Sequence, residues 1–245
     1  MATAQELEAM MSKAMRAHQA GRLDEAQASY KAVLKSVPEH VPTLHFLGLA
    51  YFQHGKPDRG IEFVKRALAL KPDYVEAHYN LATALQGLGR VDEAIDHYNQ
   101  ALAIDPNNPD AHNNLGAIFL QQKRYDDAIG HFEKALAINP NVAQAHNNMG
   151  TALKELQRHG EAIQHFDLSL AINPADPEVS CNLGTVFLEL GRHDAALAAF
   201  DHALSFNSEL AQAWYGRGHA LKAVDRQDEA VMAFEKAQAL DPNLT

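Results

Sequence analysis

Basic side chains are scarce in this sequence, and cysteine and tryptophan occur only once each. The 21 Lys and Arg residues stand against 31 Asp and Glu residues, which gives a formal net charge of −10. A protein that grips nucleic acid or an anionic membrane surface needs a basic footprint, so we expect neither partner. Because Cys181 is the only cysteine, the chain can form neither an intramolecular disulfide framework nor a CxxC pair.

Long apolar runs are missing as well. A membrane-spanning helix needs about eighteen or more consecutive apolar residues, and the sequence contains no such run, so we expect no membrane insertion. The stretch Met1–Met11 lacks a basic region followed by an apolar one, which argues against a secretion signal. With one cysteine and no export signal, the expected location is the reducing cytoplasm.

The sequence motifs of common catalytic sites are also lacking. The chain contains no GxxxxGK[ST] phosphate-binding loop, no HExxH zinc motif, no GxSxG nucleophile turn and no calcium-loop pattern. We therefore predict a protein that is not an enzyme and that needs no cofactor.

What the sequence does contain is a repeat of 34 residues, marked by proline. Taking each proline as position 32 of a unit defines seven repeats, preceded by an N-terminal extension of residues 1–6. A regular period of this length is typical of a stacked array, so we predict one array over residues 7–245. The prolines are Pro38, Pro72, Pro106, Pro140, Pro174 and Pro242, with Ser208 in the sixth unit, and the repeats span 7–40, 41–74, 75–108, 109–142, 143–176, 177–210 and 211–244.

Three further columns of the repeat keep the same phase. Positions 8 and 20 hold only Ala or Gly, and position 24 holds a large apolar residue or an aromatic one. Small residues let two helix backbones approach, and a bulky side chain then fills the remaining space. In the third repeat, 75–88 and 91–104 each carry apolar residues with helical periodicity, separated by Gly89. The predicted fold is therefore all-α, with two helices, A and B, in each repeat.

These columns resemble the tetratricopeptide repeat (TPR). The resemblance covers residues 7–244 and rests on a large residue at position 4, Leu-Gly at positions 7–8, Ala at 20 and 27, an aromatic residue at 24 and Pro at 32. It implies a right-handed superhelical solenoid of seven tandem helix-turn-helix repeats. It also implies a non-enzymatic protein-interaction scaffold, whose A helices form a concave groove for a peptide or a partner segment. The matching residues include Trp214, Leu47-Gly48, Leu115-Gly116, Leu183-Gly184, Ala67, Ala101, Ala135, Ala203 and Ala237.

Asparagine occupies position 6 of four consecutive repeats, at Asn80, Asn114, Asn148 and Asn182. Asparagine is a poor residue for a helix interior, so its recurrence asks for a reason. One interpretation is that each carboxamide holds the main chain of an extended ligand, which would pass about three residues per repeat. The other is that the amides bond to the neighbouring A helix and set the pitch of the array. The sequence leaves both interpretations open.

The resemblance also points other residues of the A helices into the groove. The acidic residues Glu76, Asp110 and Glu178 favour a neutral to basic partner over an acidic one. Phe46 is expected either to anchor an apolar side chain of the ligand or to belong to the core between repeats. The remaining candidate binding residues are Asn113, Asn147, Tyr79, Thr83, Thr151, Thr185 and Lys154.

Two other functions remain open. The asparagine ladder is similar to that of the repeat region of O-linked N-acetylglucosamine transferases, which implies a substrate-recognition array of a larger, bacterial-type glycosyltransferase. Alternatively the array is a structural scaffold that associates end to end, through an apolar terminal face formed by Val231, Phe234 and Leu240.

Histidine and cysteine are weak candidates for a reactive centre. Each of two histidine ladders spaces its members by one repeat, or roughly 10 Å, whereas ligands of one ion lie within about 2 Å of it. Neither ladder alone can form a metal site, so we expect the protein to have no metal site, and we expect Cys181 to be a small filler rather than a nucleophile. The ladders are His78, His112 and His146 at position 4, and His97, His131 and His165 at position 23.

Overall fold

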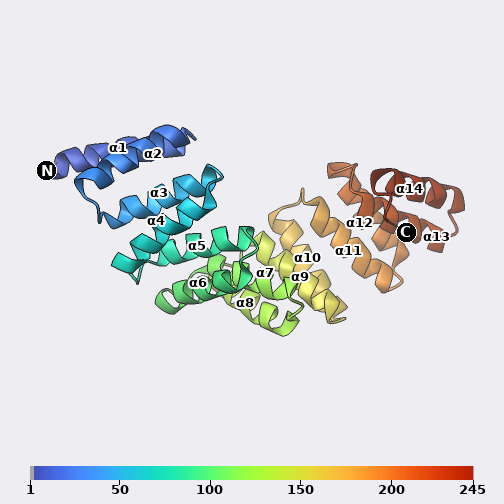
Figure 1. The fold of residues 1–245 in the computed structure, drawn as a ribbon. Helices are drawn as coiled ribbons and strands as arrows, with labels where there is room; N and C mark the ends of the chain where they lie inside the picture. Colours follow the sequence, from blue (N-terminus) through green and yellow to red (C-terminus); the bar gives the residue numbers. More distant parts are fainter. Residues whose placement is uncertain (1–2, 245) are drawn as a thin grey trace. The chain divides into compact units, whose positions relative to one another are not determined.

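A computed structural model describes residues 3–244, and every regular element within that range is a helix. Fourteen helices follow one another as seven pairs, one pair in each repeat, and the described residues include no strand (Figure 1). The all-α fold with paired helices, predicted from the 34-residue period, is confirmed. In the described part of the chain, none of the helices is both long and apolar enough to span a bilayer.

The internal contacts divide the chain into two compact units, an N-terminal unit ending at Ala111 and a C-terminal unit beginning at His112. Each is described by itself below, and a single array over residues 7–245 stays a prediction. The N-terminal unit contains α1 (Ala4–Gln19), α2 (Leu23–Ser36), α3 (Val41–Gln53), α4 (Pro57–Leu70), α5 (Val75–Gly87) and α6 (Val91–Ile104). The boundary falls within α7 (Pro109–Gln121), and the C-terminal unit continues with α8 (Tyr125–Ile138), α9 (Ala143–Glu155), α10 (His159–Ile172), α11 (Pro177–Glu189), α12 (His193–Phe206), α13 (Ala211–Ala223) and α14 (Gln227–Leu240).

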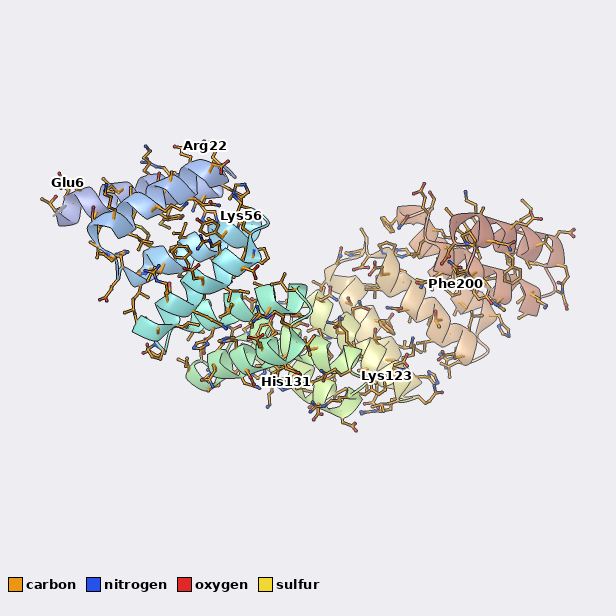
Figure 2. All side chains as sticks on the ribbon, in the orientation of Figure 1. Glu6, Arg22, Lys56, Lys123, His131 and Phe200 are labelled. Carbon is orange, nitrogen blue, oxygen red and sulfur yellow. The ribbon has the colours of Figure 1, made fainter. Side chains whose placement is uncertain are left out.

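Helix α1 begins before the first predicted repeat, because Thr3 caps it. The Glu6 backbone N–H donates to Thr3 Oγ1 at 3.3 Å, and the Thr3 backbone N–H donates to Glu6 Oε2 at 2.7 Å (Figure 2 labels Glu6). This reciprocal capping box satisfies two backbone donors that the helix end leaves unpaired. Residues 4–6, which the phase of the repeat assigned to an extension, therefore belong to the first helix.

The core of each repeat is the contact between position 8 of its A helix and position 24 of its B helix. In the sixth repeat, a Cβ atom built on Gly184 would lie 2.8 Å from the Phe200 ring, so a larger residue there would require the ring to move. Phe200 itself has no exposed surface, and its label in Figure 2 lies on α12. The same approach recurs between Gly116 and Phe132 and between Gly150 and Phe166. The small and large columns found in the sequence are thus two sides of one packing contact.

Each A helix is followed by a left-handed residue at position 15, and its identity varies between repeats. Glycine takes φ values of 68 to 72° at Gly21, Gly55 and Gly89 in the N-terminal unit and at Gly191 in the C-terminal unit. The other repeats of the C-terminal unit have a residue with a side chain there, Lys123, Gln157 or Asp225, with φ of 59 to 60° (Figure 2 labels Lys123). A side chain in this region strains the backbone, whereas glycine adopts it without strain because it has no Cβ atom.

Candidate functional site

Within the C-terminal unit, Asn148 and Asn182 at position 6 hydrogen-bond to the A helix of the preceding repeat. Asn148 Nδ2 donates to Asn113 Oδ1 at 3.4 Å, and Asn182 Nδ2 donates to Asn147 Oδ1 at 3.3 Å. In both cases position 6 of one repeat bonds to position 5 of the repeat before it. The structure therefore contains the contact between repeats that was one of the two interpretations of the ladder.

The N-terminal unit makes the same link with different chemistry. Asn80 Nδ2 donates to His45 Nε2 at 3.0 Å, so the other ring nitrogen, Nδ1, carries the proton and donates to Tyr74 Oη at 3.1 Å. His45 is 2% exposed, and this burial lowers its pKa from 6.5 to about 4. The imidazole is therefore neutral at pH 7, so Nε2 keeps the lone pair that accepts the hydrogen bond from Asn80.

The threonines at position 9 donate their hydroxyl protons to their own helix. Thr151 Oγ1 donates to the Asn147 carbonyl and Thr185 Oγ1 to the Cys181 carbonyl, both at 3.0 Å. A hydroxyl that donates in this way presents its lone pairs outward, so it can accept an N–H from a ligand. Thr83 makes the same bond to the Tyr79 carbonyl at 3.1 Å, and its side chain is exposed.

Side chains of three A helices in the C-terminal unit, α9, α11 and α13, line one hollow of about 380 Å³, which we call the amide hollow. Three of the predicted binding residues lie in it, namely Asn182, Thr185 and Lys154. The sequence patterns did not indicate Tyr215, Gln212 or His219, although they occupy the inward positions 5, 2 and 9 of the seventh repeat. The full lining is Lys154, Cys181, Asn182, Thr185, Leu188, Gln212, Tyr215, Gly216, His219 and Leu244.

The asparagine ladder stops at the amide hollow because position 6 of the seventh repeat is Gly216. A Cβ atom at Gly216 would overlap the buried Phe200 ring, so the ring takes the place that a side chain would need. The missing side chain leaves Cys181, the residue at position 5 of the sixth repeat, without the amide partner that Asn147 has in Asn182. The hollow is therefore the place where the link between successive repeats is interrupted.

The electrostatics of the amide hollow do not favour a reactive thiol. Burial is the main cause that raises the pKa of Cys181 to about 11; the charge of Lys154 lowers this pKa, and the charge of Glu178 raises it by a smaller amount. The thiol is 7% exposed and stays protonated at neutral pH. Lys154 Nζ lies 3.2 Å from Glu155 Oε1, which balances the only cation of the lining.

The N-terminal unit has a hollow of different composition, which we call the apolar hollow. Its volume is about 390 Å³. Phe46 forms part of its wall and also stacks on Tyr30, with ring centroids 6.3 Å apart, so it packs against the core, and its use as a ligand anchor stays a prediction. Tyr79 is not part of this hollow and packs edge-on against Tyr98 at 5.9 Å. The lining is Met15, His18, Gln19, Gly21, Tyr30, Phe46, Leu49 and Gln53.

A polar triad closes the floor of the apolar hollow. His18 Nε2 donates to Gln53 Oε1 at 3.1 Å, which leaves His18 Nδ1 to accept from the Tyr30 hydroxyl at 3.2 Å. Burial raises the pKa of Tyr30 to about 12, so its hydroxyl keeps its proton. The polar groups of His18, Tyr30 and Gln53 are thus bonded to one another, and the other residues that line the hollow are mostly apolar.

Two further sequence predictions, on metal binding and on the terminal face, concern residues outside these hollows. Among the described residues, no group of three or more His, Cys, Asp or Glu side chains is arranged to hold a metal ion. Of the expected terminal face, Val231 is 55% exposed, while Phe234 and Leu240 are partly buried. End-to-end association stays a prediction.

Comparison with protein-family models tests the resemblance to the tetratricopeptide repeat that the repeat columns suggested. A tetratricopeptide repeat model matches residues 11–75, 47–109, 79–143 and 181–244, and a second one matches residues 141–209. The chain belongs to the tetratricopeptide repeat family. The TPR matches run through both units and reach all seven predicted repeats. A search of curated proteins finds no match.

Solved TPR structures resemble the chain over most of their own length. A MamA protein is 30% identical with a TM-score of 0.62, over 69% of this chain and 92% of that one. A tetratricopeptide repeat protein from Parabacteroides merdae is 22% identical with a TM-score of 0.72, over 98% and 94% of the two chains. YrrB, described as a TPR protein with an unusual peptide-binding site, is 22% identical with a TM-score of 0.64, over 75% and 94%.

Proposed function

We propose that this TPR protein is an interaction scaffold that captures an extended segment of a partner protein on the A-helix face. The proposal applies to each unit by itself. The family supports it in general terms, and the peptide-binding site named for YrrB is a precedent among similar folds.

The amide hollow is the observation that carries the proposal. Asn182 donates one of its two amide protons to Asn147, so its second amide proton and its carbonyl oxygen can form hydrogen bonds with a ligand. Thr185 adds an outward acceptor, as described above. A peptide bond offers one donor and one acceptor, which matches this pair of side chains. The bond between repeats and the bond to a ligand therefore do not compete for the same atoms of Asn182.

The repeat spacing suits an extended chain. Adjacent A helices lie roughly 10 Å apart, and an extended peptide advances about 3.1–3.4 Å per residue. One carboxamide per repeat would therefore meet every third peptide bond of the ligand. Because these contacts use the main chain, the ligand's side chains would be selected mainly by charge and by the two hollows.

The charges favour a neutral to basic segment. Lys154, the only cation in the lining of the amide hollow, is already paired with Glu155. Lys154 and, more weakly, Glu178 act on Cys181 electrostatically, so with Lys154 already paired Glu178 adds a negative charge beside the hollow. An acidic ligand would be repelled by this charge, whereas Lys or Arg side chains would be attracted to it.

The test is selection of short peptides from a random display library on the full-length protein, followed by measured affinities. Each hydrogen bond is worth about 0.5–1.5 kcal/mol, so the triple variant N114A/N148A/N182A should weaken binding on the order of 100-fold. N99A removes an exposed asparagine from α6, outside the A helices, and serves as the matched control with unchanged affinity.

Two results would contradict the proposal. Equal affinity of the triple variant and N99A, with helicity preserved, would mean that the amides act only between repeats. Selection of predominantly acidic peptides would contradict the expected charge of the partner. The triple variant should also lose about 1 kcal/mol of stability for each bond between repeats, which thermal unfolding monitors separately.

A further inference from the structure

Three consecutive repeats each bring one histidine of the A helix against one histidine of the B helix. In all three the two Nδ1 atoms face each other at hydrogen-bond distance. Neither sequence ladder contains such a contact on its own, because the pairing joins position 4 of a repeat to position 23 of the same repeat. The pairs are His78–His97 at 3.0 Å, His112–His131 at 3.1 Å and His146–His165 at 2.9 Å.

A backbone carbonyl sets the tautomer of the A-helix histidine. His78 Nε2 lies 2.9 Å from the Pro72 carbonyl oxygen, and His146 Nε2 lies 3.1 Å from that of Pro140. A carbonyl can only accept, so Nε2 carries the proton and Nδ1 presents a lone pair to the second histidine. These A-helix rings are 6–8% exposed and are thus held in place by packing as well as by the carbonyl.

This arrangement has the features of a metal ligand with its supporting shell. Metal-bound histidines commonly donate their other ring N–H to a backbone carbonyl, which orients the ring and makes the ligating nitrogen more basic. The B-helix histidine is partly exposed in each pair, so it can rotate about its outer torsion and expose its own Nδ1. His131 is labelled on α8 in Figure 2.

We propose that each histidine pair binds one divalent copper or nickel ion through its two Nδ1 atoms, with water as the remaining ligands. At a metal–nitrogen distance of about 2.0–2.1 Å, nitrogens 2.9 to 3.1 Å apart subtend about 90–100° at the ion. That angle fits adjacent positions of a square-planar or octahedral site, the geometry of Cu²⁺ and Ni²⁺. A tetrahedral Zn²⁺ site would need a wider separation.

Binding requires a change of tautomer and a turn of the B-helix ring. The ion replaces the proton on Nδ1 of the B-helix histidine and lies to one side of the line between the two nitrogens, because a metal–nitrogen distance of about 2.0–2.1 Å exceeds half their separation. The displaced proton passes through solvent to Nε2 of the B-helix histidine. Both imidazoles are then neutral ligands, and nothing is oxidised or reduced.

A carboxylate lies one helical turn before each B-helix histidine, namely Glu93, Asp127 or Glu161. Each of these carboxylates is ion-paired with an arginine and is therefore not counted as a ligand.

The experiment is titration of the full chain with Cu²⁺ and, in parallel, Ni²⁺, by calorimetry, with electron paramagnetic resonance of the copper-loaded protein. The variant H97Q/H131Q/H165Q keeps a donor toward each A-helix Nδ1 but removes one ligand from every site. It should lose three equivalents of tight binding, and H165Q alone should lose one equivalent. H202Q is the matched control, because His202 bonds to Ser180 instead of to a histidine and should leave the titration unchanged.

Three equivalents bound with unchanged affinity by the triple variant would overturn the proposal. A copper spectrum without coupling to two nitrogens would do the same. If the triple variant does not fold, H146L/H165F supplies the second test, because the second repeat carries Leu44 and Phe63 at these two positions. This variant should lose one tight site and retain the other two.

Discussion

The two hollows show how one repeat can produce two different surfaces. In the N-terminal unit the inward positions 5 and 6 of the second repeat are His45 and Phe46, and the adjoining hollow has a hydrogen-bonded floor and apolar walls. In the C-terminal unit position 6 carries asparagine until Gly216, and the hollow presents Asn182 and Thr185. The backbone of the repeat is shared, so the surface chemistry follows from two side chains per repeat.

The comparison also distinguishes the side-chain groups that link successive repeats from those that can bind a ligand. Both units link successive A helices from position 6 to position 5, by Asn80 to His45 in one and by Asn182 to Asn147 in the other. Only the asparagine pair keeps the same hydrogen-bonding capacity at every pH. The link in the N-terminal unit depends on a neutral imidazole.

The largest expected effect comes from Phe200, which joins the core of the C-terminal unit to the floor of its hollow. F200A should destabilise this unit by about 3–5 kcal/mol, because it leaves a cavity between Gly184 and Gly216. Y30F in the N-terminal unit is the comparison, because it removes only the hydroxyl bonded to His18 and should cost about 1 kcal/mol. Urea unfolding measures both, and similar losses would contradict the different roles of the two rings.

The pH dependence of the N-terminal link is the next largest effect. The pKa of His45 falls from 6.5 to about 4 on folding, so below pH 6.5 the unfolded chain binds a proton that the folded chain excludes. The stability due to neutral His45 is therefore fully present above 6.5 and is lost as the pH falls toward 4. At pH 5 the loss is on the order of 2 kcal/mol.

The variant H45N isolates this effect, because it replaces the titrating acceptor by the residue that the C-terminal unit uses in Asn147. Unfolding curves of the wild type and H45N at pH 8 and pH 5 give the difference due to His45 alone, since the other histidines are common to both. A wild-type stability that falls no more steeply than that of H45N would show that His45 does not control the link.

The smallest effect concerns the turns that separate A and B helices. K123G and Q157G should each stabilise the C-terminal unit by about 0.5–1 kcal/mol, because they relieve a positive φ at a residue with a side chain. G89A in the N-terminal unit should have the opposite sign, at a φ of 72°. Thermal unfolding of the three variants tests the contrast, and a stabilising G89A would contradict it.

Periodicity predicts the fold because every repeat obeys the same packing rule. Glycine or alanine at position 8 and a large residue at position 24 recur at a fixed distance in the sequence, so their column alone marks Phe132, Phe166 and Phe200 as core residues. Tyr215 and Gly216 are harder to interpret, because their importance comes from interrupting a pattern. In the sequence, Gly216 looks only like a break in the asparagine column, because a glycine has no side chain whose chemistry indicates a role.

The amino-acid sequence alone determined the length of the repeat, the pairing of helices and the family, because these depend on local propensity and on contacts at a constant sequence separation. Only the tertiary structure decided which side chains of different helices meet. The His146–His165 contact and the Asn182–Asn147 link join residues whose separation along the chain says nothing about the direction of their side chains. Those directions depend on how neighbouring helices pack.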